Sequence, residues 1–146
     1  MAPLVSLIGG FIVLRLIGLA GVEALDGWQP ALRGGLALMF TVTASAHFVP
    51  GMRRDLIAMV PPSLPNPGLL VTVTGVLELA GAVGLLIERT ATAAGIALAL
   101  LLVAMFPANV SAARRQITML GKPATPIVRR SLEQVLYLAA AVAASL

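Results

Sequence analysis

The sequence predicts an all-α integral membrane protein, because it is poor in charge, rich in apolar residues and divided into apolar segments of helix length. Of its 146 residues, 59% are hydrophobic and only 11% are charged, whereas soluble domains carry about 25% charged residues. Ten basic and six acidic side chains cannot cover the surface that a domain of this size exposes to water. A surface that faces lipid can be apolar, so the composition favours membrane-spanning helices.

Five apolar segments are expected to form these helices. The first lacks the basic start of a signal peptide and is interrupted by Arg15, which favours a retained helix over a cleaved one. The last is shorter than the about 20 residues that a bilayer crossing needs, so we expect it to begin earlier or to tilt. In chain order the segments are residues 3–22, 32–49, 68–87, 90–106 and 132–146.

The connecting segments differ in character. Residues 23–33 are short, and Trp28 is placed there as an anchor at the membrane interface. Residues 52–60 favour a short amphipathic helix on the membrane surface. A run of prolines follows and forbids further helix until Gly68. Glu88 and Arg89 are expected to form a tight turn.

The distribution of basic residues predicts the topology. Residues 111–130 contain five basic side chains and no acidic one, so the positive-inside rule places this segment in the cytoplasm. Alternation along the chain brings Arg53 and Arg54 to the same side. We therefore expect a multi-pass protein of the cell membrane whose N-terminus is cytoplasmic and whose C-terminus is outside.

Composition also narrows the function classes. The chain has no cysteine and a single histidine, which excludes disulfides, thiolate metal sites, iron–sulfur clusters and a bis-histidine haem within one copy. No metal and no covalently bound cofactor are expected. The net charge of +4 is attributed to topology and to anionic lipid headgroups rather than to nucleic acid.

Polar side chains inside the apolar segments are the candidate site, because an ionisable group in a membrane costs roughly 2.5–3.5 kcal/mol on insertion scales and needs compensation. With the predicted topology, these groups converge on the cytoplasmic half of one bundle. That arrangement favours a polar-lined pocket between helices. The candidate ligand-binding residues are His47, Thr74, Glu78, Asn109 and Gln134.

Each candidate also has a purely structural alternative, which the sequence leaves open. Glu78 could be ion-paired with Arg15, which is predicted to lie at a similar depth. His47 could bond to a loop carbonyl at the end of its helix. Asn109 could cap the fourth helix, and Gln134 could donate an interhelical hydrogen bond.

Several of these residues lie in motifs that resemble the DoxX and DoxX-like membrane proteins. The resemblance runs from about Leu32 to the end of the chain, including Arg130 with Gln134. It implies a four-helix transmembrane bundle for residues 32–146, to which residues 1–31 add one N-terminal transmembrane helix and a short outer loop. The motifs are Ala46–Phe48, Val60–Pro65, Thr74–Leu79 and Phe106–Val110.

The resemblance implies a link to membrane redox processes, because the family is named for a subunit associated with thiosulfate:quinone oxidoreductase. It carries His47 and Glu78 over as a polar site. One hypothesis is an accessory subunit that binds a small apolar ligand, such as a quinone or an isoprenoid, while a protein partner supplies electrons. The others are a structural or assembly subunit, and a lipid-modifying enzyme with Glu78 and His47 as acid and base. Catalytic residues, ligand identity and homo-oligomerisation stay open.

Overall fold

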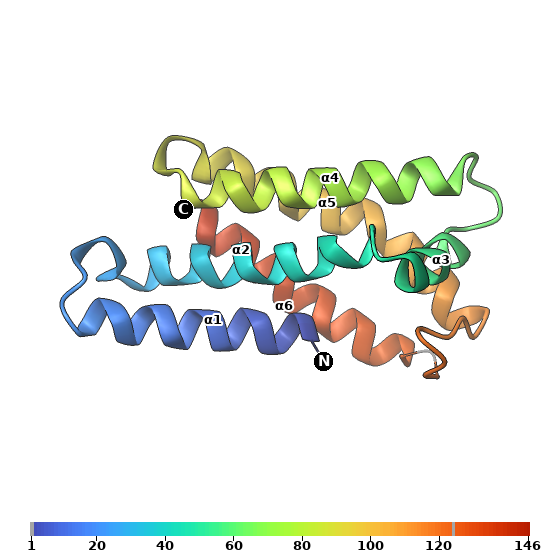
Figure 1. The fold of residues 1–146 in the computed structure, drawn as a ribbon, viewed down its shortest axis with the longest axis horizontal. Coiled ribbons are helices and arrows are strands. Elements are labelled where there is room, and N and C mark those ends of the chain that lie inside the picture. The colour runs from blue at the N-terminus through green and yellow to red at the C-terminus, as the bar shows by residue number, and fades with distance from the viewer. Residues whose placement is uncertain (1, 124) are drawn as a thin grey trace.

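The computed structural model describes residues 2–123 and 125–146, and within them the chain is entirely helical apart from its connections (Figure 1). This confirms the predicted all-α class. A single turn of 3-10 helix, Glu23–Leu25, links the first two helices. The helices are α1 (Ala2–Leu19), α2 (Trp28–Ala46), α3 (Pro50–Met59), α4 (Pro67–Leu86), α5 (Glu88–Arg114) and α6 (Ile127–Ser145).

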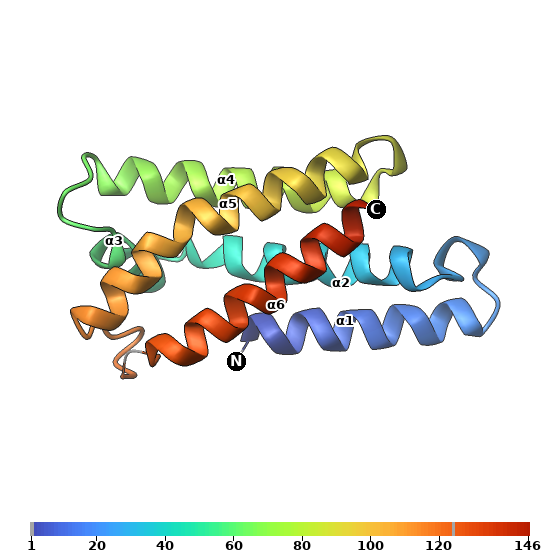
Figure 2. The same cartoon turned by 180° about the vertical axis from the view of Figure 1, so that it is seen from behind.

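The long helices lie side by side, with α2 between α1 and α4 (Figure 1). The helix α5 packs against α4 and α6, and α6 crosses back obliquely to α2 (Figure 2). The fully buried side chains that join these helices are Leu36, Met39 and Phe40 of α2, Leu85 of α4 and Leu98 of α5. The core is therefore centred on α2.

The outward faces are apolar, as lipid contact requires. The helices α1, α4 and α5 are long and apolar enough to cross a membrane, and α2 qualifies only together with α3, from which it is bent by 91°. The prediction of five spans is thus supported for three helices, or four with the bent pair. Helix α6 is outside this set because its first two turns carry Arg129, Arg130 and Glu133.

Several helix boundaries differ from the sequence-based prediction. Helix α3 and the start of α4 agree with it to within two residues. A tight turn does separate α4 and α5, but it is at Ile87, and Glu88 and Arg89, which were expected to form it, lie in the first turn of α5. However, α5 does not end at Phe106. It continues through Pro107 to Arg114, because one proline removes a single amide donor and membrane helices tolerate that loss. Helix α6 begins at Ile127, as expected from its short apolar part.

Basic side chains gather at one end of the bundle, which we call the basic end. It contains α3, the end of α5 and the start of α6, whereas the C-terminus lies at the opposite end (Figure 1). This juxtaposition of the 50–67 and 111–130 segments is what the alternating topology requires. The residues of the basic end are Arg53, Arg54, Arg114, Arg115, Lys122, Arg129 and Arg130.

We predict that the basic end faces the cytoplasm. The chain has no native cysteine, so single cysteines report the side of the membrane directly. Thr118→Cys, exposed at the basic end, should resist a membrane-impermeant maleimide added to intact cells. Ala24→Cys, exposed at the opposite end, should react. Labelling of Thr118→Cys from outside, with Ala24→Cys protected, would contradict the predicted orientation and show that the basic end faces the outside.

Candidate functional site

His47 lies directly after the last residue of α2 and is buried, with 4% of its surface exposed. Its Nδ1 lies 2.7 Å from the carbonyl oxygen of Val71 in α4. Because a carbonyl can only accept, Nδ1 must carry the proton. In the neutral imidazole, Nε2 is then an acceptor that faces the bundle interior. The predicted bond from His47 to a carbonyl is therefore present, although the carbonyl belongs to a helix and not to a loop.

Glu78 lies near the middle of α4 and is 3% exposed. Its Oε2 accepts a hydrogen bond of 2.7 Å from the Thr43 hydroxyl of α2. Its Oε1 lies 3.7 Å from Nε2 of His47, which is too long for a direct hydrogen bond. The facing atoms of the two titratable groups are thus close enough to interact electrostatically, but they do not form a hydrogen bond with each other.

Thr74 completes this group, one helical turn before Glu78. Its hydroxyl lies 3.3 Å from Nδ1 of His47 and donates to the carbonyl of Leu70 at 2.9 Å. We call Thr43, His47, Thr74 and Glu78 the His47–Glu78 cluster. Sequence reasoning left Thr43 out of the candidate set, although its spacing of four residues from His47 places both on one helix face.

A glycine allows the imidazole to enter between the helices. A Cβ added to Gly75 would lie 2.6 Å from Cβ of His47, which is closer than two carbon atoms that are not bonded to each other can approach. Gly75 lies between Thr74 and Glu78 on the α4 surface that meets α2. Gly75 therefore leaves the space that the His47 side chain occupies against α4, and Thr74 places a hydroxyl beside the imidazole.

The cluster can hold one proton without a net charge. A neutral carboxyl beside a neutral imidazole and a carboxylate beside an imidazolium both sum to zero. Either arrangement avoids an isolated buried ion, whose desolvation costs several kcal/mol. Chemically, the cluster can therefore present a proton donor or a proton acceptor at the same place.

Asn109 and Gln134 lie at a different interface, between α5 and α6. Oδ1 of Asn109 accepts a hydrogen bond of 2.7 Å from Arg130. Asn109 is inside α5, so its predicted role as a helix cap is wrong. Nε2 of Gln134 donates to the carbonyl of Leu102 at 2.8 Å, which confirms the interhelical hydrogen bond. The structure thus divides the five candidates between two pairs of helices, α2–α4 and α5–α6.

Arg15 does not pair with Glu78. Its guanidinium lies 3.2 Å from Oδ1 of Asp26, in the connection that follows α1. Helix α1 packs on the side of α2 away from α4 (Figure 1), and Arg15 lies only about one turn from the end of α1. The ion pair considered from similar depths is therefore wrong, because depth along a helix does not say which helices are neighbours.

A groove of about 560 Å³ lies between α4 and α5. We call it the α4–α5 groove, and it is lined mainly by small and apolar side chains. Within the described ranges 2–123 and 125–146, no three His, Asp or Glu side chains gather as metal ligands do. The lining of the α4–α5 groove includes Leu77, Ala80, Gly81, Ala97 and Leu101.

Comparison with known families adds one finding. A family model described as "Domain of unknown function (DUF8561)" matches residues 36–144, which is most of the chain. The chain belongs to this family. The match begins within α2 and leaves α1 outside. Comparison with curated proteins gave no match, and comparison with solved structures gave none either.

We predict energetic coupling between His47 and Glu78. In a double-mutant cycle of His47→Gln and Glu78→Gln, the coupling free energy should reach about 1 kcal/mol, because both groups are buried and 3.7 Å apart. The matched cycle of Arg15→Met with Glu78→Gln should be additive within about 0.5 kcal/mol. Unfolding of the purified protein in mixed micelles by added dodecyl sulfate measures both. Coupling to Arg15 and none to His47 would contradict the observed pairing.

Proposed function

We propose that the protein is a DoxX-like accessory membrane protein that binds a small apolar ligand, quinone-like or isoprenoid-like, beside the His47–Glu78 cluster and serves a membrane redox process. The observation that carries the proposal is a buried carboxyl–imidazole pair whose facing atoms are not hydrogen-bonded to each other. Each group has one protein partner, Thr43 for Glu78 and the Val71 carbonyl for His47, and the facing atoms are 3.7 Å apart. A ligand oxygen between these two atoms could hydrogen-bond to both of them.

The position of the α4–α5 groove supports a ligand with an apolar tail. Leu77 and Gly81 line the groove on either side of Glu78 in the sequence. On a helix of 3.6 residues per turn, Glu78 lies roughly 60–100° round the axis from them. Glu78 itself faces α2 and does not line the groove. A head group at the Leu77 end of the groove would lie beside the turn of α4 that carries Glu78. The volume of about 560 Å³ falls within the range of small-molecule sites.

The chemistry of the cluster suits an oxygen-bearing head group. A quinone carbonyl needs a donor, and a quinol hydroxyl needs an acceptor. In the His47–Glu78 pair the protonated group can donate and the unprotonated group can accept, so either need is met without a change of net charge. In this proposal the chain holds the ligand and the proton, and a protein partner supplies the electrons.

One observation favours a second candidate, a structural or assembly subunit. The chain's own hydroxyls and carbonyls already bond to one side of each titratable group, through Thr43 to Glu78 and through Val71 to His47. In that role the cluster would only fasten α2 to α4, and no ligand would be needed.

Mass spectrometry of copurified lipid separates the two candidates. The protein, purified from native membranes in mild detergent, should retain a quinone or isoprenoid lipid enriched over the bulk membrane extract. Ala97→Phe, at an exposed position of the groove, should abolish the enrichment. Ala104→Phe, exposed on α5 but outside the lining of the groove, is its matched control and should not.

The cluster itself is tested by Glu78→Gln, which keeps the shape and the hydrogen-bonding capacity but removes the titratable proton. We expect a folded protein that retains less of the lipid. Absence of enrichment in a folded wild-type protein would reject the binding proposal and favour the structural subunit.

A further inference from the structure

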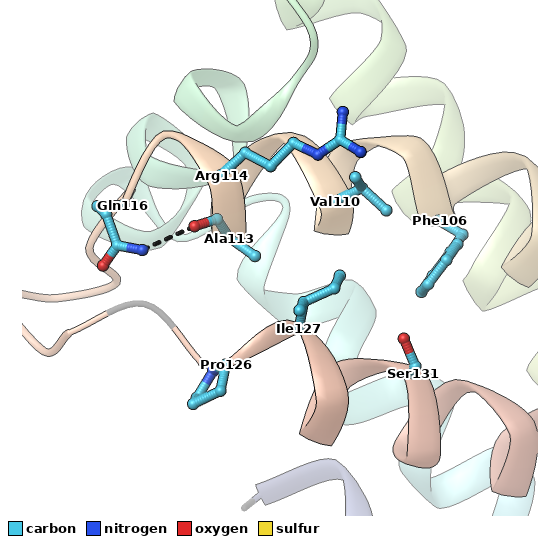
Figure 3. A pocket seen from close by; sticks show the side chains of 8 residues that line it. All are labelled: Phe106, Val110, Ala113, Arg114, Gln116, Pro126, Ile127 and Ser131. Atoms are coloured by element: carbon cyan, nitrogen blue, oxygen red, sulfur yellow. Dashed lines mark hydrogen bonds between the residues drawn. The ribbon is translucent and has the colours of Figure 1, made fainter.

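A second cavity, of about 420 Å³, lies between the last turns of α5 and the first turns of α6. We call it the α5–α6 groove. In Figure 3 apolar side chains from both helices face the space, and the Arg114 side chain extends along its edge. The groove lies at the basic end and shares no lining residue with the α4–α5 groove. Its lining includes Phe106, Val110, Ala113, Arg114, Ile127 and Ser131.

Arg114 differs from most other arginines at the basic end in having no partner within the described parts of the chain. No hydrogen bond or ion pair engages its guanidinium in residues 2–123 and 125–146. Arg53, Arg115 and Arg130 instead bond to groups of the fold, and Arg129 pairs with Glu133. A charged donor therefore stands at the rim of an apolar groove with its hydrogen-bonding capacity unused.

The charge around the groove is positive. The described acidic residues of the basic end are Asp55 and Glu133, and both are engaged. Oδ2 of Asp55 accepts a hydrogen bond of 2.8 Å from the backbone amide of Leu120, and Glu133 pairs with Arg129 at 2.9 Å. An anionic group at Arg114 therefore meets little opposing negative charge.

The lining decides between a soluble anion and a lipid. A small anion such as phosphate is held by several converging donors, whereas this groove offers one guanidinium and the Ser131 hydroxyl beside an apolar wall. The neighbouring α6 surface is apolar and open, with Val128 69% and Leu132 67% exposed. This surface continues the groove along the lipid-facing side, so a molecule with both a phosphate and an acyl chain fits it.

We propose that the α5–α6 groove is a binding site for an anionic phospholipid, whose acyl chain packs against Phe106, Val110 and Ile127 and whose phosphate pairs with Arg114. Basic grooves between membrane helices recognise anionic headgroups through this combination of charge and apolar contact. The site is independent of the proposed ligand at the His47–Glu78 cluster, because it is formed by other residues.

Native mass spectrometry in a non-ionic detergent tests the site. The protein is titrated with phosphatidylglycerol and with phosphatidylcholine of the same acyl chains. We expect phosphatidylglycerol to bind roughly fivefold to tenfold more tightly, and Arg114→Gln to remove this preference. Arg54→Gln is the matched control, because Arg54 is also exposed at the basic end but does not line the groove. It should leave the preference unchanged.

A second variant tests the apolar wall. Val110→Trp fills the groove and should weaken binding of both lipids. If tryptophan at this position disturbs folding, the exposed Arg114→Gln variant still tests the proposal. Equal losses in Arg54→Gln and Arg114→Gln would reduce the effect to the general charge of the basic end and overturn the proposal. Displacement of phosphatidylglycerol by excess inorganic phosphate would also overturn it, since the site would then bind a soluble anion.

Discussion

Replacing Arg53 with methionine should lower the free energy of unfolding by about 2–4 kcal/mol, since a hydrogen bond to a charged group contributes about 1.5–3 kcal/mol and several are lost together. The guanidinium of Arg53 donates to the carbonyl of His47 at 2.9 Å and to the carbonyl of Gly68 at 3.0 Å. It also donates to the hydroxyl of Thr72 at 2.9 Å. One side chain of α3 thus fastens the end of α2 to the start of α4. Methionine keeps the apolar stem and removes all three bonds.

The neighbouring residue provides the control. Arg54 is exposed, and Arg54→Met removes the same charge at almost the same place, so it should cost less than about 0.5 kcal/mol. Arg53→Lys should recover only part of the loss, because an ammonium cannot reproduce the planar fork of a guanidinium. Dodecyl sulfate titration followed by circular dichroism gives all three values. Equal stability of Arg53→Met and Arg54→Met would show that the bend between α2 and α3 does not depend on this arginine.

Gly35→Ala should destabilise the protein by about 1–3 kcal/mol, as overpacking of a close interface does. A Cβ at Gly35 would lie 2.7 Å from the carbonyl oxygen of Leu7 and 2.9 Å from the amide nitrogen of Phe11. Both are backbone atoms of α1, so no side-chain rotation can relieve the contact. The whole of α1 must move away from α2.

Gly9→Ala is the matched control within the same helix pair. A Cβ at Gly9 meets nothing within 4 Å, and alanine is a better helix former than glycine by roughly 0.5–1 kcal/mol. Gly9→Ala should therefore be neutral or stabilising in the same unfolding measurement. If Gly35→Ala proved as stable as Gly9→Ala, the close approach of α1 to α2 would be wrong.

The sequence predicts the helices of this protein better than their ends. Long apolar runs identify α1, α4 and α5, because lipid-facing surface and buried core are both apolar. The same criterion predicts an end of α5 at Phe106 and a start of α6 at Leu132. Both helices in fact extend further into the polar surroundings of the basic end, α5 to Arg114 and α6 from Ile127. Pro50 predicts a break after α2. The 91° angle that follows depends on contacts of α3 with distant segments, which no local pattern contains.

The members of the candidate site were predictable only in part, since Thr43 was missed, and their arrangement was also predictable only in part. His47, Thr74 and Glu78 stand out as polar residues in apolar segments, and the structure brings them together. Asn109 and Gln134 satisfy the same criterion but bond across α5–α6. Sequence position gives the depth of a side chain in a helix, whereas the identity of neighbouring helices follows from packing. That difference explains both the correct grouping of His47 with Glu78 and the wrong pairing of Arg15.

The short distance between His47 and Glu78 also determines how the cluster responds to voltage. A proton that moves between Nε2 and Oε1 travels less than the 3.7 Å that separates these atoms, a small fraction of a hydrocarbon layer about 30 Å thick. A full elementary charge crossing the membrane gains about 2.3 kcal/mol per 100 mV, so this step gains at most about 0.3 kcal/mol for the same potential. The position of a proton within the pair, on His47 or on Glu78, is therefore nearly insensitive to the electrical potential across the membrane.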